Sequence, residues 1–382
     1  MKIAQVSPLM ESVPPKLYGG TERIVSYLTE ELERQGHEVT LFASGDSRTS
    51  AELVASVPQA LRLAKARDPT AYNVLQLEKV RQRIANFDIL HFHTDHLHFP
   101  MLRSLPVPAV TTLHGRLDLP ELPPLFREFA EAPVVSISAH QRQPLAANFV
   151  ATVPHGLPRD LYPFSRVASG GYLAFLGRIC PDKGPVQAIE IARRAGAKLK
   201  IAAKVDKVDE AFFETEVRPL LAQPHVEFIG EIGEDKKGEF LGAAKALLFP
   251  IDWPEPFGLV MIEAMACGTP VIASRCGSVS EVVEHGVSGY IVDGFDEAVA
   301  AVAGIDSLDR ASVRRCFEAR FTAERMARNY VKLYERLLRS AGSTRRESTR
   351  GHDRDGGAMA LEGVSRGVDI RRPFGQERPN DE

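Results

Sequence analysis

Short apolar runs and segments of helical spacing alternate along this chain, and that alternation restricts its fold more than any other feature. Lys2–Ser7 and Glu38–Ala43 are strand candidates, and Thr21–Gln35 between them has helical spacing, with Thr21 as its expected N-cap. Further apolar runs that end in polar residues predict strands at 88–92, 109–113 and 134–137. This order indicates a doubly wound α/β domain, in which ligands bind at the carboxyl ends of the strands.

A second series of the same kind follows a hinge. Pro154–Pro158 holds two prolines around a glycine, which is typical of a linker. We therefore expect two Rossmann-like domains that face a cleft, at residues 1–157 and 158–320. In the second domain the sequence predicts strands at 172–176, 199–203, 226–229, 246–249, 270–273 and 289–292, and helices at 185–195, 209–222, 258–267 and 295–303.

The composition changes near the end of the chain. Thr322–Arg339 carries an apolar stripe at helical spacing, so residues 321–340 are predicted to form a C-terminal helix that packs across the domains. Residues 341–382 have few apolar side chains to offset the entropy of ordering. We expect them to be a disordered tail.

Charge and cysteine content exclude several classes of protein. The formal net charge is −3, which gives no global field for nucleic acid, so no nucleic-acid partner is expected. The four cysteines are scattered without metal or disulfide spacing. No apolar run reaches the length of a transmembrane helix, and the N-terminus lacks a signal-peptide pattern. We therefore expect a cytoplasmic protein without a transmembrane span.

The segment Trp253–Pro270 is the richest in candidate chemistry. A strand ends shortly before it and a helix is expected to begin near Gly258, so the first amides of that helix form an anion site. Glu255 lies just before this start, crowded by prolines, and Glu263 lies about a turn and a half inside the helix, where it could face the cleft. We interpret the pair as functional rather than as a solvated pair of carboxylates.

A loop between a strand and a helix supplies two cations. Arg178 and Lys183 are five residues apart in Gly177–Gly184, so both could converge on one anion. Arginine presents a planar fork of donors and lysine a point charge, which together suit a diphosphate. With the helix start at Gly258, they would make a two-sided phosphate clamp.

Two further loops are expected to approach a ligand. Gly19 and Gly20 lie between the first strand and the first helix, where glycines let the backbone come close to a ligand. They do not form the G-x-G-x-x-G dinucleotide pattern, which disfavours a nicotinamide dehydrogenase. His114 follows a strand and precedes a glycine, so it would project into the crevice, although a structural histidine is an equal alternative.

Two other patterns allow more than one interpretation. Four histidines between His91 and His98 invite a metal site, but no carboxylate or cysteine set completes it, so crevice-lining or structural histidines are favoured and no metal is expected. The basic stretch from Arg62 to Arg83 could dock an anionic acceptor or a membrane surface, although acidic residues interrupt it and favour a solvated face.

Taken together, these segments resemble the retaining glycosyltransferases of family 4, which have the GT-B fold. The resemblance covers roughly residues 1–340, and the loop ending in Tyr-Gly-Gly-Thr-Glu is most similar to that of the avilamycin-type subgroup. Glu255 and Glu263 match the E-x7-E motif of the family, and Gly177–Gly184 matches its GR…KG motif. Gly19–Gly20 match its N-terminal glycine loop, and His114 matches its N-domain catalytic-site histidine.

The resemblance implies a hexosyltransferase with a nucleotide-diphosphate-sugar as donor substrate and no cofactor. The N-terminal domain would be the acceptor side and the second domain the donor side. Arg178 and Lys183 would bind the diphosphate and stabilise the leaving group, Glu263 would hold the ribose, and the loop 230–232 would flank the base. The other implied donor or catalytic contacts are Gly19, Gly20, His114, Glu255, Phe257, Gly258 and Leu259.

The sequence departs from the family pattern at two places. His155-Gly156 stands where Asn-Gly is frequent, and Lys204 replaces a usual glycine and becomes a candidate phosphate ligand. The D-x-D pattern of metal-dependent transferases occurs only at 353–355, inside the expected tail, so the reaction is expected to be metal-independent.

Several alternatives stay open at this level. The acceptor is a sugar, a lipid or a small molecule, and a peripheral membrane contact is not excluded. The chain could instead bind nucleotide sugars without transfer, or be another GT-B enzyme such as a phosphorylase or an epimerase.

Overall fold

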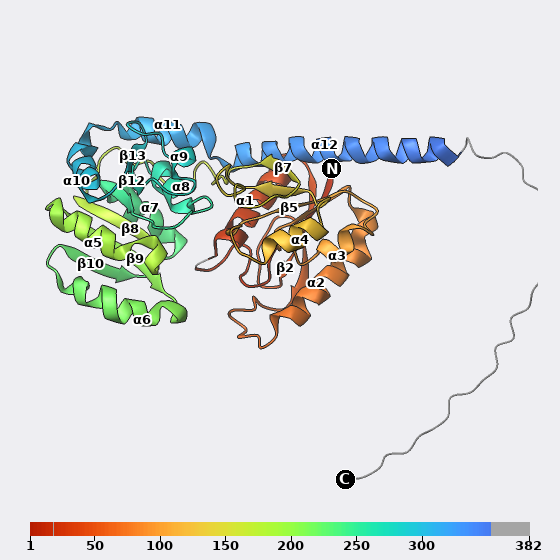
Figure 1. Ribbon diagram of the computed structural model, residues 1–382, viewed down its shortest axis with the longest axis horizontal. Helices are drawn as coiled ribbons and strands as arrows, with labels where there is room; N and C mark the ends of the chain where they lie inside the picture. Colours follow the sequence, from red (N-terminus) through yellow and green to blue (C-terminus); the bar gives the residue numbers. More distant parts are fainter. Residues whose placement is uncertain (18, 353–382) are drawn as a thin grey trace, which may run out of the picture. The chain divides into compact units, whose positions relative to one another are not determined.

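The computed structural model describes residues 1–17 and 19–352, with side chains as far as residue 342 (Figure 1). Its N-terminal domain is built on a parallel sheet with the strand order β3-β2-β1-β4-β5-β6-β7. The strands are β1 (Lys2–Val6), β2 (Glu38–Ser44), β3 (Glu52–Val57), β4 (Ile89–Phe92), β5 (Ala109–Thr112), β6 (Val134–Ser136) and β7 (Phe149–Thr152), and the helices are α1 (Gly20–Arg34), α2 (Pro69–Arg83), α3 (Phe99–Leu102) and α4 (Leu122–Glu128).

The second domain is built on another parallel sheet, with the order β10-β9-β8-β11-β12-β13. Figure 1 shows its elements in green to blue. The strands are β8 (Tyr172–Ile179), β9 (Lys198–Val205), β10 (Val226–Gly230), β11 (Ala246–Phe249), β12 (Val271–Ser274) and β13 (Gly289–Val292), and the helices are α5 (Pro185–Arg194), α6 (Glu210–Phe212), α7 (Glu234–Ala243), α8 (Leu259–Ala266), α9 (Val279–Val282), α10 (Phe295–Gly304), α11 (Arg310–Arg320) and α12 (Ala323–His352). The expected α/β class with two Rossmann-like domains is therefore confirmed.

In both sheets the strand order reverses beside the first strand of the domain. β1 pairs with both β2 and β4, and β8 pairs with both β9 and β11. At such a switch point the loops after neighbouring strands diverge and leave a crevice at the carboxyl end of the sheet. The loops after β1, β8 and β11 carry the glycine, arginine–lysine and glutamate motifs, so the topology gathers all three at such crevices.

The last helix returns to the first domain. Leu157 donates its N–H to the carbonyl of Phe321 (2.9 Å) and accepts from the N–H of Ala323 (2.8 Å), so the two crossings between the domains lie side by side. A Cβ on Gly156 would lie 2.3 Å from the carbonyl oxygen of Thr322, so only glycine allows this close crossing. The apolar stripe of α12 then packs into the N-terminal core, which contains Met326, Tyr330, Leu333 and Tyr334 with Ile3, Ile24, Leu28, Ile89 and Val110.

Several elements were not predicted from the sequence. β3 and β7 are the edge strands of their sheet and are only partly buried, so neither has a continuous apolar run. Helix α2 buries only Gln76 and Val80, and its polar surface hides the helical spacing. Helices α7 and α11 were also missed.

Two predictions about helices were wrong. The helix expected over 209–222 is broken into α6, a π turn and a 3-10 turn, because Pro219 cannot donate the hydrogen bond that a continuous helix needs. Helix α1 begins at Gly20 without a side-chain cap, so Thr21 is a helical residue rather than the N-cap.

The C-terminal helix is longer than predicted. We had placed its end at residue 340 and the start of the tail at 341, but α12 continues to His352. Loss of the apolar stripe removes packing, yet a helix that has already formed can extend through residues of moderate helix propensity. The predicted tail beyond 352, with the pattern at 353–355, lies outside the described residues. None of the helices in residues 1–17 and 19–352 is both long and apolar enough to cross a membrane.

Candidate functional site

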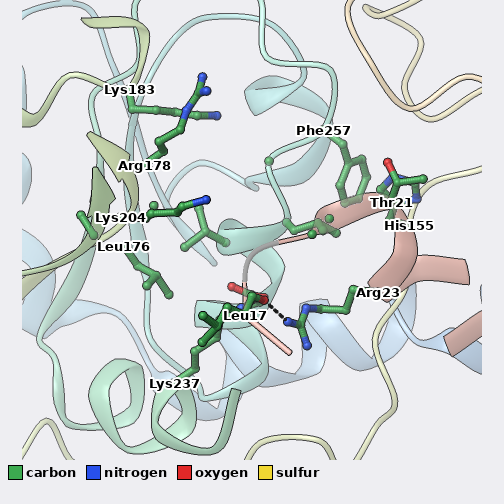
Figure 2. A pocket seen from close by; sticks show the side chains of 18 of the residues that line it. Leu17, Thr21, Arg23, His155, Leu176, Arg178, Lys183, Lys204, Lys237 and Phe257 are labelled. Carbon is green, nitrogen blue, oxygen red and sulfur yellow. Dashed lines mark hydrogen bonds and ion pairs between the residues drawn. The ribbon is translucent and has the colours of Figure 1, made fainter. Parts of the chain in front are cut away.

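A cavity of about 430 Å³ lies between loops of the two domains and collects all ten site residues predicted from the sequence (Figure 2). The glycine loop and the loop after β5 contribute from the N-terminal domain, and β8, the loop after it and the start of α8 contribute from the second. The ten residues are Gly19, Gly20, His114, Arg178, Lys183, Glu255, Phe257, Gly258, Leu259 and Glu263.

The two cations of the predicted clamp line the same cavity but pair with different carboxylates. Lys183 makes an ion pair with Glu255, whereas Nη1 of Arg178 lies 3.6 Å from Asp206 and 3.8 Å from Asp209. Figure 2 shows the Arg178 and Lys183 side chains next to each other on one wall. Two cationic side chains therefore lie together on this wall, and acidic side chains hold them in place.

Lys204, which departs from the family pattern, extends this wall. Its Nζ lies 2.7 Å from a carboxylate oxygen of Asp206, the same residue that pairs with Arg178. Lys204 and Arg178 lower the pKa of Asp206, an effect that outweighs its partial burial. Asp206 therefore stays ionised and links the two cations.

The start of helix α8 forms the opposite side of the anion site. Gly258 precedes the helix with φ of 76°, a left-handed conformation that favours glycine, and a Cβ there would lie 2.7 Å from Met261. Gly258, Leu259 and Val260 all line the cavity. The first amides of a helix have no intrahelical acceptor, so this end can bind an anion.

The loop that carries Glu255 is held by residues that the sequence analysis missed. Gly277 has φ of 57°, and a Cβ there would lie 2.4 Å from the backbone nitrogen of Glu255. Ser278 donates its N–H to the carbonyl of Glu255 (3.0 Å) and its hydroxyl to that of Phe257 (2.9 Å). The signal that could have found them is the Cys-Gly-Ser sequence at 276–278, separated by one residue from the end of strand β12.

Glu263 lies at the centre of a buried ionic network. Nζ of Lys237 lies 2.7 Å from Glu263 and 3.5 Å from Glu234, and Glu234 also contacts Arg23 of the N-terminal domain and the hydroxyl of Tyr162. Burial, with Glu263 and Glu234 nearby, raises the pKa of Tyr162 well above its ordinary value. Figure 2 shows Arg23 and Lys237 on the same side of the pocket. The network joins the predicted ribose ligand to both domains.

His114 is buried among other histidines. Its Nε2 lies 2.8 Å from Nδ1 of His93, and its ring stacks on that of His155 with 5.2 Å between centroids. Burial lowers the pKa of His114 to about 3, so the ring is neutral near pH 7. The Nδ1 atoms of His114 and His155 are both buried without a hydrogen-bond partner in the described part of the chain.

The buried histidines among residues 91–98 make hydrogen bonds inside the protein, as the structural interpretation predicts. His91 hydrogen bonds with Tyr334 and Thr112 (both 2.7 Å), and His98 with Thr111 (2.8 Å). Within residues 1–17 and 19–352, no group of three or more potential metal ligands comes together.

Besides Arg23, three more charged residues of the N-terminal domain line the cavity and were not predicted as site residues. Glu11 and Glu22 line it, and burial raises the pKa of both carboxyl groups. Arg62, which we had grouped with the basic stretch, also lines it and lies 2.8 Å from Glu11. The position of Glu22 directly after Gly-Gly-Thr is the signal that could have found it.

The rest of the basic stretch does not line this cavity. Arg81 pairs with Glu78 and Arg83 with Glu52, both at 2.7 Å, and Nζ of Lys79 donates to the carbonyl of Ala55. The expected base-flanking loop contributes Glu231 and Ile232, but not Gly230, to the cavity lining.

Two family models match the two domains in turn. Residues 18–154 match the model described as glycosyltransferase family 4, and residues 167–315 match the one described as glycosyl transferases group 1. The boundary between the matches falls at the hinge.

Curated relatives are similar over most of the chain. A phosphatidyl-myo-inositol mannosyltransferase of Mycolicibacterium smegmatis is 26% identical over 92% of this chain and 99% of its own length. An alpha-maltose-1-phosphate synthase of Mycobacterium tuberculosis is 27% identical over 75% of this chain and 84% of its own length.

Solved structures share the two-domain architecture, which is the GT-B fold. A glycosyltransferase involved in avilamycin A biosynthesis superposes with a TM-score of 0.69, at 25% identity, over 88% of this chain and 98% of its own. This similarity agrees with the avilamycin-type resemblance of the glycine loop. An Anabaena protein, HepE, solved in complex with UDP-glucose, superposes with a TM-score of 0.64 at 19% identity, over 90% of this chain and 100% of its own.

Proposed function

The chain belongs to glycosyltransferase family 4, and from this premise we propose that it is a retaining hexosyltransferase that uses a nucleotide-diphosphate-sugar without a metal ion. The observation that carries the proposal is the anion site, in which Arg178, Lys183 and the start of α8 line one cavity. Such a site suits the diphosphate of the donor and the charge that develops on it as the sugar leaves.

Cleavage of the bond between the anomeric carbon and the diphosphate creates an oxocarbenium-like centre and an anionic leaving group. Arg178 supplies a fork of donors, Lys183 a point charge, and α8 its first amides, so this chain carries fixed positive charge where the anion forms. These groups perform the task that a divalent cation performs in metal-dependent transferases. We therefore propose that the reaction needs no metal.

The remaining cavity residues position the donor. Glu263, held by Lys237, would accept hydrogen bonds from the ribose hydroxyls, and Glu255 would contact the sugar hydroxyls near the reacting carbon. Gly19 and Gly20 would let the backbone approach the diphosphate from the N-terminal domain. Contributions from both domains mean that bound donor is shielded from water, which limits hydrolysis.

Retention of the anomeric configuration is proposed from the family resemblance, and the substrate classes are proposed from the relatives. The relatives named above act on a phosphatidylinositol or make a sugar phosphate, so the acceptor is proposed to be a sugar, a lipid or a small molecule. UDP-glucose is the first donor to test, because the Anabaena fold neighbour was solved with it.

A donor panel tests this function. Thermal shift against nucleotide sugars, beginning with UDP-glucose, should reveal one that raises the melting temperature by mass action. Transfer of that sugar, measured as nucleoside diphosphate release, should persist in EDTA and yield a product of retained anomeric configuration by proton NMR. Arg178→Ala and Glu255→Ala should each lower the rate by about 10²-fold or more.

Arg218→Ala is the matched control, because this exposed arginine pairs with Glu214 and is outside the cavity lining. If Arg178→Ala and Glu255→Ala both kept wild-type rates, the site assignment would be wrong. Binding of a nucleoside diphosphate without transfer to any acceptor would indicate a binding protein. Phosphate-dependent release of a sugar 1-phosphate would indicate a phosphorylase, and a sugar epimer would indicate an epimerase.

A further inference from the structure

A continuous chain of buried hydrogen bonds connects helix α12 to the cavity. The side-chain amide of Gln5, on β1, donates from Nε2 to the hydroxyl of Tyr334 at 3.3 Å. Its Oε1 lies 2.8 Å from Nε2 of His93, and Nδ1 of His93 lies 2.8 Å from Nε2 of His114. Gln5 and His93 are buried, so water does not compete for these contacts.

The orientation of the Gln5 amide determines the tautomers along this chain. An amide oxygen can only accept, so Nε2 of His93 carries the proton that it receives. Neutral His93 then has a bare Nδ1, which accepts from Nε2–H of His114. Neutral His114 therefore has its lone pair on Nδ1. Burial lowers the pKa of both rings, so both remain neutral near pH 7.

The surroundings of Tyr334 agree with this direction. Because its oxygen accepts from Gln5, its proton is available to Nδ1 of His91 at 2.7 Å. His91 then donates from Nε2 to the hydroxyl oxygen of Thr112 at 2.7 Å, which leaves the Thr112 proton for Tyr330 at 2.8 Å. Each of these three contacts then pairs one donor with one acceptor.

The chain of donors and acceptors is complete except at Nδ1 of His114, its last atom. Nδ1 of His114 is buried and has no partner within the described residues, and His114 lines the cavity. Leaving a buried acceptor unpaired costs free energy, because the acceptor has lost its hydrogen bonds to water. A ligand hydroxyl that donates to this atom would remove that cost.

We propose that Gln5 and His93 are positioning residues that hold His114 in the Nε2–H tautomer, so that its Nδ1 accepts a hydrogen bond from a hydroxyl group of a bound sugar. The identification of the ligand as a hydroxyl group rests on the proposed glycosyl transfer, but the assignment of the tautomer does not. In this role His114 selects a hydrogen-bond donor and does not act as a general base. Helix α12 contributes through Tyr334, although this residue is outside the cavity lining.

The tautomer is measured on the ligand-free full chain with nitrogen-15 labelled histidine. Long-range proton–nitrogen correlation at neutral pH distinguishes protonated from bare ring nitrogens, and His114→Gln identifies the His114 signals by their loss. We expect a protonated Nε2 and a bare Nδ1 in His114. The opposite tautomer, or a cationic ring, would overturn the proposal.

Two variants distinguish a positioning role of Gln5 from the effect of losing any two buried hydrogen bonds. Gln5→Met removes the contacts to Tyr334 and His93, whereas Thr112→Val removes an equal number, to His91 and Tyr330. Gln5→Met should move the His114 nitrogen signals toward those of a tautomer mixture, and Thr112→Val should leave them in place. Equal shifts in the two variants would contradict the assigned role, and Tyr334→Phe gives a second disturbance of the Gln5 amide if Gln5→Met does not fold.

Kinetics then test the consequence for the ligand. With the donor found by the panel above, Gln5→Met should lower kcat/KM by about tenfold, which corresponds to one lost hydrogen bond to a substrate hydroxyl. Thr112→Val should stay within about twofold of wild type. If no nucleotide sugar is turned over, the proposed function fails while the NMR result still decides the tautomer. If transfer occurs and both variants lose activity equally, the positioning role fails alone.

Discussion

At the scale of single residues, Lys183 lies between a carboxylate and two aromatic rings. It pairs with Glu255, and its Nζ lies 5.0 Å from the ring centroid of Trp253 and 5.9 Å from that of Phe249. These contacts restrict a side chain that is flexible in water, so its charge is already in place for the diphosphate of the proposed donor. Prior placement of charge is what makes an electrostatic contribution to catalysis large.

Lys183→Met should therefore lower kcat by about 10²-fold or more while leaving the fold intact. It should also leave Glu255 without its cation, so affinity for a nucleoside diphosphate falls as well. Steady-state kinetics and calorimetric titration with the nucleoside diphosphate measure the two effects. Lys198→Met is the control, since this exposed lysine begins β9 at the end of the strand remote from the cavity. Equal rates for the two variants would remove Lys183 from the mechanism.

The sequence predicted which residues line the cavity but not which side chains hold them. Motif residues follow strand ends, and parallel topology brings those ends together. Their partners come from elsewhere: Lys237 lies on α7, which was missed, and Arg23 lies in the other domain. Such pairs depend on tertiary packing, which local sequence patterns do not encode.

At the scale of elements, the loop after β12 acts as a support for the loop after β11. Gly277 lies against the backbone of Glu255, and Ser278 hydrogen bonds to both Glu255 and Phe257. The position of the Glu255 carboxylate therefore depends on a loop that does not itself line the cavity.

Gly277→Ala should destabilise the protein by about 3 kcal/mol, from a left-handed φ and a backbone clash together. Donor affinity should fall as well, because the loop carrying Glu255 must move. Gly286→Ala is a matched control: Gly286 also has a positive φ, of 78°, but a Cβ there meets nothing within 4 Å. Gly286→Ala should lower the free energy of unfolding by only about 1–2 kcal/mol, and this variant should bind donor normally. Chemical denaturation and donor titration distinguish the two; similar values for both variants would disprove the supporting role of Gly277.

Buried helices and strands were easier to predict from the sequence than exposed ones. Central strands such as β1 and β4 read as mainly apolar runs because both faces of a covered parallel sheet are buried. Edge strands β3 and β7 and the polar helix α2 lack that signal. The end of α12 was also misplaced, because helix propagation does not require an apolar stripe.

At the scale of the whole molecule, five buried histidines couple stability to pH. Burial lowers the pKa of all five below the ordinary value of 6.5, and the pKa of His98 and of His114 falls to about 3. The other three are His91, His93 and His155. Below about pH 6.5 the unfolded chain therefore binds more protons than the folded chain. The free energy of unfolding should fall as the pH decreases through this range.

Urea unfolding between about pH 7.5 and pH 5 measures this effect. Glu11 and Glu22 act in the opposite direction, because burial raises their pKa and the folded state takes up protons first. The histidines outnumber them, so we expect a net loss of stability on acidification. His98→Gln should flatten the profile, whereas His96→Gln, at an exposed position in the same loop, should not. A stability that is constant over this range would contradict the burial of neutral imidazoles.

The side-by-side crossings at Leu157 and Phe321 mean that the N-terminal domain is not a continuous stretch of chain. Its core includes Tyr330 and Tyr334, which are encoded after the whole second domain. During synthesis this core therefore cannot close until nearly all of the enzyme has been made. A fragment of residues 1–157 should expose apolar surface and give poorly dispersed NMR spectra, and fragment 158–382 should restore order when the two are mixed. Tyr330→Ala in the second fragment should weaken that reconstitution, so severing the chain at its hinge produces complementing halves rather than two independent proteins.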